Sequence, residues 1–356
     1  MRESAGAVVP LLAWALVAGP TGAAEPKAVT PFKLGTFEAQ GRSFVGLVRA
    51  DQMVVDVAAA LVASETGQAA GPRPKAPADM RDLITRYDEL REPLRLLAAP
   101  GARAVHALAT LKIRPPLLNP EAMLNAAVNY TEHETEMRQR SGASAPGPLP
   151  RSAPGLWERR ADDTRHNPYL FMKPRTALVA DGEAIRIPPG REQIDWECEL
   201  AVVVARRASQ VPVDRAPDYV FGYTLENDVS DRGGRGDSRH GSDWLVGKAH
   251  DTFAPLGPFI VPKEFVPDPH QLGIRFSLSG TLMQDSSTER MTHNVYELLH
   301  YASNILTLLP GDVISTGSPA GVGSARNPPI FMKPGDVAEC TIQGIGTLTN
   351  PVVAAR

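Results

Sequence analysis

The sequence is short of cysteine and has no large excess of charge of either sign. Only two of its 356 residues are cysteines, which excludes a disulfide-dense scaffold and any zinc site built from cysteines alone. With 37 basic and 40 acidic side chains, the formal net charge is −3, too close to neutral for a surface that binds a polyanion. Nucleic acid is therefore not expected as a partner. No internal repeat of roughly 20 to 50 residues is present, which excludes solenoids and propellers.

Long apolar runs are also missing, except near the N-terminus. Residues 5–18 are almost wholly apolar, follow Arg2 and precede small residues that end at Ala24. This run is shorter than the roughly 20 residues that cross a bilayer, so the pattern predicts a secretory signal peptide over residues 1–24. We expect an exported, periplasmic protein with no membrane span in the mature chain. A cytoplasmic protein with a disordered extension is the alternative.

What the sequence does have is apolar residues, proline and glycine. A hydrophobic share of 43% against 22% charged residues can bury one large or two ordinary cores. The 33 prolines and 30 glycines, without any repeat, indicate many turns between short strands. The chain is therefore expected to fold as a mainly β protein with some α-helix.

Two domains are predicted, a small β-rich one over 25–118 and a larger one over 119–356. The first has strand patterns at 32–37, 43–48 and 53–57 and helical spacing at 78–97 and 102–111. The larger one has one clear helix, over 294–308, and strand patterns at 183–188, 196–205, 219–226, 259–261, 274–278, 313–316 and 337–342. Residues 141–155 are rich in Pro, Gly and Ser and predict a loop, either a plain linker or a lid.

One strand pattern carries two acids on the same face. Side chains of a strand alternate between faces, so Glu197 and Glu199 point together, while Trp196 and Cys198 point oppositely. A solvated strand face would carry such a pair at little cost. However, the segment continues into Ala-Val-Val-Val, which indicates burial on both faces, and buried paired carboxylates need a cation or a shared proton. Oxygen ligands favour Mg²⁺, Mn²⁺ or Ca²⁺ over zinc.

A third acid, Asp228, ends the next strand pattern. Asn227-Asp228 alone would be typical of a turn. The loop beyond it carries cations that could hold an anionic substrate beside a metal ion: Arg232, Arg235, Arg239, His240 and Lys248. A solvated basic loop is the alternative.

A histidine and a glutamate stand three residues apart in the segment that precedes the 141–155 loop. If this segment is helical, the carboxylate of Glu136 lies beside His133 and could orient the imidazole and raise its basicity. An exposed ion pair is the alternative.

A strand pattern near the C-terminus enters a glycine-rich turn. Its glycines let backbone N–H groups approach a ligand, and Thr316 adds a hydroxyl, so the turn could hold a carboxylate. The turn lacks the Gly-Lys-Ser/Thr of a P-loop and the glycine spacing of a Rossmann fold. It is therefore not a nucleotide-binding loop.

Together and in this order, these motifs resemble those of the fumarylacetoacetate hydrolase family. The Gly-Asp-x-Ile-x-Thr-Gly-x-Pro-x-Gly-Val-Gly run at 311–323 is the most specific signature. Other family-like segments are Phe171–Pro174, Glu197-x-Glu199, Gly222–Thr224, Asn227–Ser230 and Trp244–Lys248. The likeness covers residue 119 to the C-terminus and is weaker before that. It implies an α+β fold, with a mixed β-roll catalytic domain preceded by a small N-terminal domain, and usually a homodimer.

The resemblance also implies three sets of site residues. The ligands of a divalent metal, Mg²⁺ foremost with Mn²⁺ or Ca²⁺ as alternatives, would be Glu197, Glu199 and Asp228. The residues that activate water and stabilise the oxyanion would be His133, Glu136 and Lys248. The residues that bind the substrate would be Arg232, Arg235, Tyr223, Thr316 and Gly317. Asn129 stands where some longer members carry a metal-binding aspartate, which indicates the site type with three carboxylates.

The activity implied is hydrolysis of a carbon–carbon bond in a β-diketo or acylpyruvate-type carboxylic acid, with the metal stabilising the enolate. Arg235 replaces the glutamine that often follows the metal aspartate in the family, which favours a more anionic small-molecule substrate. A decarboxylase, hydratase or isomerase of a 2-oxo acid with the same metal–enolate site is the nearest alternative. A non-catalytic exported binding protein is the alternative from another class.

The two cysteines are expected to stay unpaired. Cys198 lies inside the predicted metal-binding strand, and Cys340 lies far along the chain in another strand.

Overall fold

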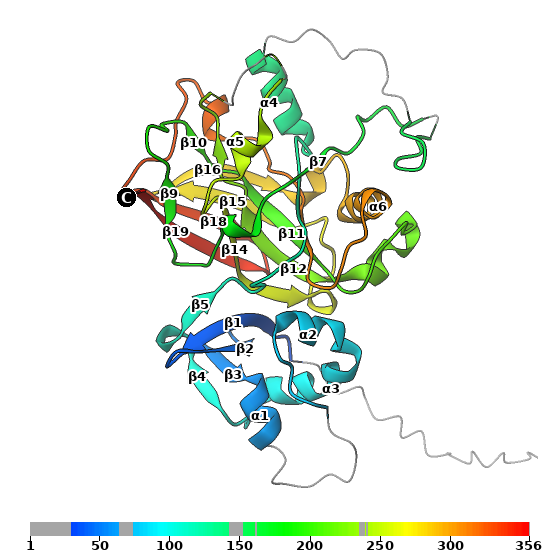
Figure 1. The fold of residues 1–356 in the computed structure, drawn as a ribbon, viewed down its shortest axis with the longest axis vertical. Helices are drawn as coiled ribbons and strands as arrows, with labels where there is room; N and C mark the ends of the chain where they lie inside the picture. The colour runs from blue at the N-terminus through cyan, green and yellow to red at the C-terminus, as the bar shows by residue number, and fades with distance from the viewer. Residues whose placement is uncertain are drawn as a thin grey trace, which may run out of the picture.

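The computed structural model describes residues 30–63, 74–141, 152–160, 162–234, 239 and 241–355. Figure 1 shows a small N-terminal part, blue to cyan, below a larger part that holds the remaining strands. The predicted signal peptide lies outside the described residues, as does most of the predicted 141–155 loop. Within the described residues, no helix is long and apolar enough to cross a membrane.

The N-terminal part is a small sheet covered by helices. Its strands are β1 (Lys33–Ala39), β2 (Arg42–Arg49), β3 (Met53–Asp56), β4 (Val105–Ala107) and β5 (Lys112–Arg114). Strands β1 to β4 share one hydrophobic core with α1 (Val57–Ala63), α2 (Met80–Thr85) and α3 (Tyr87–Ala98), whereas Ile113 of β5 packs against a second cluster around Phe37. The three predicted strands are thus confirmed. The helix predicted over 78–97 is present, divided at Arg86.

The helix predicted over 102–111 is wrong. Residues 105–107 form β4, which pairs with β3 through Val105 and Val55, and residues 108–110 form a single 3₁₀ turn. A free edge of the sheet offers backbone partners to this segment, and such tertiary pairing overrides a weak helical pattern.

One long sheet joins the two parts. Among the described residues its strand order is β4-β3-β2-β1-β14-β12-β11-β17-β6-β7, while β5 pairs with β1 and β8 (Leu178–Val179) with β14. The strands of the larger part are β14 (Ala254–Pro262), β12 (Val220–Asn227), β11 (Cys198–Val204), β17 (Val313–Ser315), β6 (Met123–Ala126) and β7 (Leu170–Met172). The junction is the pairing of β1 with β14 at Leu34 and Ile260.

A second sheet packs against the larger part of the first. Its order is β16 (Thr281–Ser287), β15 (Gly273–Leu278), β18 (Val337–Ile342), β19 (Gly346–Ala354) and β9 (Ile185–Ile187). The short strands β10 (Ile194–Asp195) and β13 (Ser230–Asp231) pair separately.

Three helices accompany these sheets: α4 (Thr131–Ser141), α5 (Trp244–Lys248) and α6 (Val295–Ile305). Helix α6 confirms the helix predicted over 294–308, and the side chain of Asn294 caps its first turn by accepting from the N–H groups of Tyr296 and Glu297. The mixed, sheet-dominated architecture confirms the predicted α+β class.

Strand β11 lies where all these layers meet. Its side chains Cys198, Leu200 and Val202 face the core shared with the second sheet, whereas Ala201 and Val203 face the core shared with the N-terminal part. Every residue of the strand is buried. The predicted burial on both faces is therefore confirmed, and acids on this strand are removed from bulk water.

The prediction that the cysteines stay unpaired is wrong, because Cys198 and Cys340 form a disulfide. Strand β18 of the second sheet packs over the face of β11 that carries Cys198. This packing brings the two Cα atoms to 5.4 Å, within the range that a disulfide spans. The cysteines are 142 residues apart in the sequence. Their contact depends on the stacking of the two sheets, which the sequence separation does not reveal.

Candidate active site

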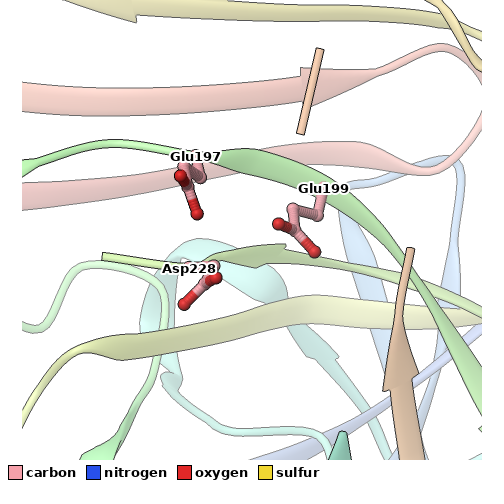
Figure 2. Close-up of side chains that lie close together, drawn as sticks. All are labelled: Glu197, Glu199 and Asp228. Carbon is pink, nitrogen blue, oxygen red and sulfur yellow. The ribbon is translucent and has the colours of Figure 1, made fainter. Parts of the chain in front are cut away.

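Two neighbouring strands bring three acids together. Strands β11 and β12 are antiparallel, with Cys198 opposite Asn227. Just beyond that pair, the N–H of Asp228 donates to the carbonyl oxygen of Glu197 at 2.8 Å, so these two acids lie side by side. Glu197, Glu199 and Asp228 each place a carboxylate oxygen within 4.8 Å of the other two, and Figure 2 shows the side chains around one small space. The structure thus groups the three acids proposed from the sequence.

The three carboxyl groups are buried, and the pKa values of the two glutamates shift in opposite directions. Burial raises the pKa of Glu199 well above its usual value, and the negative charges of Asp228 and Glu197 raise it further. Burial acts in the same direction on Glu197, but Arg232, Lys248 and His133 outweigh it and hold its pKa well below the usual value. Nearby cations therefore offset the charge of Glu197, whereas for Glu199 the attraction of Lys248 is smaller than the combined effect of burial and the neighbouring acids.

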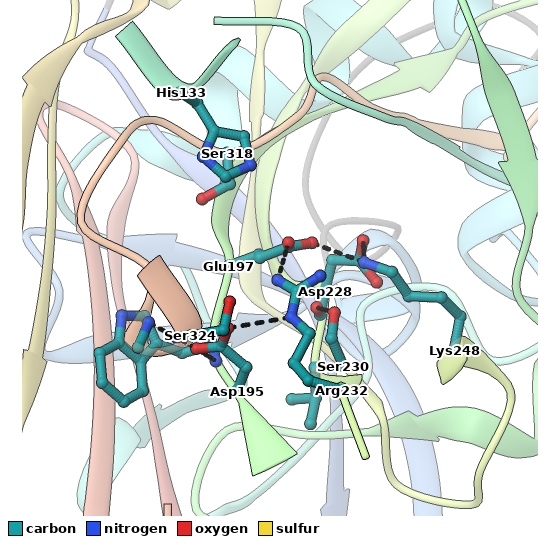
Figure 3. Close-up of polar contacts among 12 residues, drawn as sticks. His133, Asp195, Glu197, Asp228, Ser230, Arg232, Lys248, Ser318 and Ser324 are labelled. Carbon is teal, nitrogen blue, oxygen red and sulfur yellow. Dashed lines mark hydrogen bonds and ion pairs between the residues drawn. The ribbon is translucent and has the colours of Figure 1, made fainter. Parts of the chain in front are cut away.

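Buried cations line one side of the acids (Figure 3). Lys248 Nζ donates to both Glu197 and Asp228, and Arg232 donates to Glu197 and, at 2.9 Å, to Asp195. Two predicted site cations therefore lie at the acids. Asp195 also accepts from the N–H groups of Gly323 and Ser324, so it fixes Arg232 against the glycine-rich turn.

The donor set fits a divalent metal ion. One carboxylate oxygen of Glu199 accepts from the N–H of Gly317 at 2.8 Å, and the other is buried with no hydrogen-bond partner among the described residues. Three convergent carboxylates suit a hard cation that prefers oxygen ligands. The Lys248 ammonium already bridges two of them, which shows that the space attracts positive charge. This buried acidic triad can therefore bind a divalent metal.

The predicted histidine–glutamate pair lies on α4, above the acids. His133 Nδ1 lies 3.0 Å from Glu136 Oε2, and Glu136 Oε1 accepts from the N–H of Gly321 at 3.1 Å. Glu132 of the same helix contacts Ser286 and Arg290, which holds α4 down over the site. Figure 3 shows the His133 ring pointing toward Glu197.

The contact with Glu136 favours one tautomer of His133. In the neutral imidazole, a proton on Nδ1 would donate to the Glu136 carboxylate and leave Nε2 as an acceptor. An imidazole oriented in this way beside a metal site can act as a general base.

The glycine-rich turn contacts the acids directly, through a hydrogen bond from Gly317 to Glu199. Gly317 has a φ of +87°, and a Cβ there would lie 2.8 Å from the Cβ of Asn129, so only glycine fits. Because its N–H donates to Glu199, Gly317 does not offer the amide to a substrate, contrary to the prediction. Thr316 is buried beside it and stays a candidate for binding the substrate.

Asn129 has a different task from the metal-binding aspartate of longer family-like sequences. Its Nδ2 donates to the carbonyl oxygens of His293 and Thr316, and its Oδ1 accepts from the N–H of His293. With both ends of the amide engaged, Asn129 ties the base of α4 to the Thr316 turn. The structure thus agrees with a site of three carboxylates.

The prediction that Tyr223 binds the substrate is wrong. Tyr223 lies three residues before Glu226 on β12, so its side chain points to the opposite face of the strand. It belongs to the hydrophobic core, where burial and the neighbouring Tyr296 hydroxyl raise the pKa of its own hydroxyl. Arg235 and His240 lie outside the described residues, so their roles stay predictions.

Three buried polar residues of the site were not assigned from the sequence: Asp195, Lys173 and Glu226. Lys173 Nζ lies 2.7 Å from Asp228 Oδ1 and donates to three carbonyl oxygens, those of Val229, Lys248 and Phe253. A lysine inside an apolar segment was the available signal for Lys173. For Glu226, the signal was a second acid two residues before Asp228, at the end of the same strand pattern.

Comparison with known proteins identifies the family. The family model described as "Fumarylacetoacetate (FAA) hydrolase C-terminal" matches residues 122–353. The chain belongs to the fumarylacetoacetate hydrolase family. It is 35% identical over 280 residues to a protein of Xenopus laevis named "Oxaloacetate tautomerase fahd2, mitochondrial", which covers 79% of this chain and 80% of that protein.

Solved structures of relatives show the same fold. The 5-carboxymethyl-2-hydroxymuconate delta-isomerase of Mycobacterium smegmatis aligns with a TM-score of 0.63 at 28% identity over 91% of this chain and 99% of that one. The maleylpyruvate hydrolase of Sphingobium sp. SYK-6 was solved with a manganese(II) ion and pyruvate. It aligns with a TM-score of 0.67 at 26% identity, over 91% of this chain and 100% of that one. The predicted fold of this family is confirmed. The chain is thus an enzyme-family member whose relatives include tautomerases, isomerases and hydrolases.

Proposed function

We propose that this protein is a divalent-metal-dependent hydrolase that cleaves a carbon–carbon bond in a β-diketo or acylpyruvate-type carboxylic acid. The observation that carries this proposal is the position of His133, held by Glu136 and directed toward the acidic triad. Hydrolysis needs a water molecule made nucleophilic beside the electrophilic carbon, and a positioned imidazole supplies the base. The relative solved with manganese and pyruvate supports the metal requirement.

Each residue of the site has a task in this reaction. Glu197, Glu199 and Asp228 would hold a divalent ion, which would supply a Lewis acid for the 2-oxo acid. His133 Nε2 accepts the proton of the attacking water, and Glu136 stabilises the imidazolium that results. Lys248 is a buried ammonium that contacts Glu197 and Asp228 and stabilises the oxyanion as negative charge develops. Arg232 and the hydroxyl of Thr316 bind the substrate carboxylate.

A second candidate is keto–enol tautomerisation of a 2-oxo diacid such as oxaloacetate. It is favoured by the Xenopus laevis relative, which carries that activity in its name. Tautomerisation moves one proton between carbon and oxygen and needs no attacking water. His133 would then move the proton between the enol oxygen and carbon instead of taking it from water, with the same acids holding the metal.

The experiment supplies purified protein and Mn²⁺ or Mg²⁺ with acylpyruvates and, separately, with the enol form of oxaloacetate. Release of pyruvate together with the matching acid supports hydrolysis. Tautomerisation without cleavage of any acylpyruvate supports the second candidate. Release of CO₂, or a hydrated product, would replace both with a decarboxylase or hydratase. No turnover of any substrate would overturn the enzymatic proposal.

We propose Mg²⁺ as the native metal, because all the candidate ligand atoms are carboxylate oxygens. Metal analysis of protein purified from its own host without added metal tests this assignment. Stoichiometric manganese or calcium in place of magnesium would refute it.

We propose that the protein is exported, with cleavage after Ala24. The buried disulfide supports this, because disulfides persist in oxidising compartments such as the periplasm. Mass spectrometry of protein from the native host should find a chain that starts at Glu25. An intact N-terminus on cytoplasmic protein would refute export.

We also propose a homodimer. Large side chains gather next to α5, where the Trp244 ring lies 5.5 Å from the exposed Tyr169 and is followed by the exposed Leu245. Exposed apolar surface of this kind is typical of interaction sites. Light scattering should give twice the chain mass, and Leu245→Glu should give monomers. A wild-type protein of single-chain mass would refute the proposal.

A further inference from the structure

A fourth carboxylate belongs to the same strand pair as the triad. Glu226 lies opposite Glu199 in the register of β11 and β12, one residue pair further along than Cys198 and Asn227. Directly opposite residues of an antiparallel pair project to the same face with Cβ atoms about 5 Å apart. Asp228 follows Glu226 by two residues and shares that face. The four acids therefore form two adjacent cross-strand pairs, Glu199 with Glu226 and Glu197 with Asp228.

Glu226 is fully buried and only half satisfied. Its Oε1 accepts from Asn125 Nδ2 at 3.1 Å, whereas its Oε2 has no partner of full hydrogen-bond geometry among the described residues, although the nearby Ser315 hydroxyl interacts with the carboxyl group. The facing Glu199 has one buried oxygen that likewise finds no hydrogen-bond partner in the part of the chain that the structure describes. Leaving a buried acceptor unsatisfied costs free energy, and here two such acceptors belong to directly paired residues.

The buried charges around the site do not balance. The acids are Glu197, Glu199, Glu226, Asp228 and Asp195, and the cations are Lys173, Lys248 and Arg232. When these eight groups are ionised and His133 is neutral, this leaves an excess of two negative charges, which equals the charge of one divalent cation. Without Glu226 the excess would be a single charge.

We propose that Glu226 is the fourth carboxylate of the metal site. The inference rests on metal binding by the triad in the proposed function. The oxygens of Glu226 do not join the three-residue group in which every ligand atom lies within 4.8 Å of the others. Glu226 therefore acts on the ion by its charge from the position opposite Glu199, rather than as a direct ligand. Loss of such an outer partner typically weakens metal affinity about 10- to 100-fold.

Two substitutions separate charge from shape. Glu226→Gln keeps the volume and can still accept from Asn125, but removes the charge. Glu226→Asp keeps the charge on a shorter side chain. The matched control is Glu339→Gln on β18, a half-buried glutamate that accepts from the Ser277 hydroxyl at 3.0 Å and is not among the acids of the site.

The experiment is calorimetric titration of the metal-free full chain with Mn²⁺ at mildly alkaline pH. We expect the Mn²⁺ dissociation constant to rise about 10- to 100-fold in Glu226→Gln and to change little in Glu226→Asp and Glu339→Gln. In the absence of metal, Glu226→Gln should melt at a higher temperature than the wild type, because the amide removes repulsion from Glu199 and Asp228. If the role of Glu226 were purely structural, Glu226→Gln would instead lower the melting temperature and leave the Mn²⁺ affinity unchanged.

Three results would overturn the proposal. They are wild-type Mn²⁺ affinity in Glu226→Gln, equal weakening in Glu226→Asp and Glu226→Gln, and a Glu226→Gln chain that does not fold. A wild-type chain that binds no Mn²⁺ would refute the metal site itself and the proposed function with it. Because the titration measures binding without substrate, failure of the catalytic proposal alone would leave this result standing.

Discussion

Reduction of the Cys198–Cys340 disulfide should lower the stability of the protein markedly. The bond closes a loop across a sequence separation of 142 residues, and the chain-entropy relation gives about 5 kcal/mol at 25 °C for a loop of that length. Both sulfurs are buried between the sheets, so the reduced protein keeps the same core. The effect acts mainly on the unfolded chain, which regains the freedom that the closed loop had removed.

The expected shift in melting temperature follows from the size of the chain. An unfolding entropy of about 2.1 cal/mol/K per residue, for 356 residues, converts a loss of about 5 kcal/mol into a decrease of about 7 °C. The assay is thermal unfolding of oxidised protein and of protein unfolded, reduced and refolded in the presence of a phosphine reductant. Mass spectrometry after thiol alkylation verifies both redox states.

The double substitution Cys198→Ala with Cys340→Ala is the control, since its melting temperature should not respond to the reductant. An unchanged melting temperature in wild-type protein with two alkylated thiols would refute the stabilisation argument. Two free thiols in protein purified from an oxidising compartment would refute the bond itself.

Other predictions concern the acids and the base of the site. Glu199→Gln should abolish Mn²⁺ binding, because the amide lacks the charge that a hard cation requires. Circular dichroism should show that the fold of this variant is intact. Full metal content in the variant would contradict the ligand assignment. His133→Ala should reduce hydrolysis about 10²- to 10⁴-fold with metal affinity nearly unchanged, and adding Glu136→Gln should reduce it little further because the two act as a unit. Near-full turnover by His133→Ala would exclude the hydrolase mechanism. Burial and the charge of Asp228 raise the pKa of Glu226 from 4.5 to about 7, so folded protein without metal holds a proton that the unfolded chain releases. The melting temperature of the metal-free protein should therefore fall as the pH rises from 4.5 to about 7. A melting temperature that rises over this pH range would contradict the burial argument.

Local patterns in the sequence were enough for several features of this protein. The alternation of Glu197 and Glu199 with apolar neighbours predicted a buried strand with two acids on one face, because side-chain direction in a strand depends only on position along the chain. The apolar stripe after Asn294 predicted α6 for the same kind of reason. The spacing of His133 and Glu136 was sufficient to predict their contact, since a single helical turn brings them together.

Contacts between distant segments were decided only by the tertiary structure. The register of β11 with β12 places Glu226 opposite Glu199, and the stacking of the second sheet on β11 joins Cys198 to Cys340. The same register turns Tyr223 away from the site into the core. A shift of one residue in pairing would reverse every one of these faces. Pairing register and sheet stacking depend on the packing of the whole core, so no local pattern in the sequence contains them.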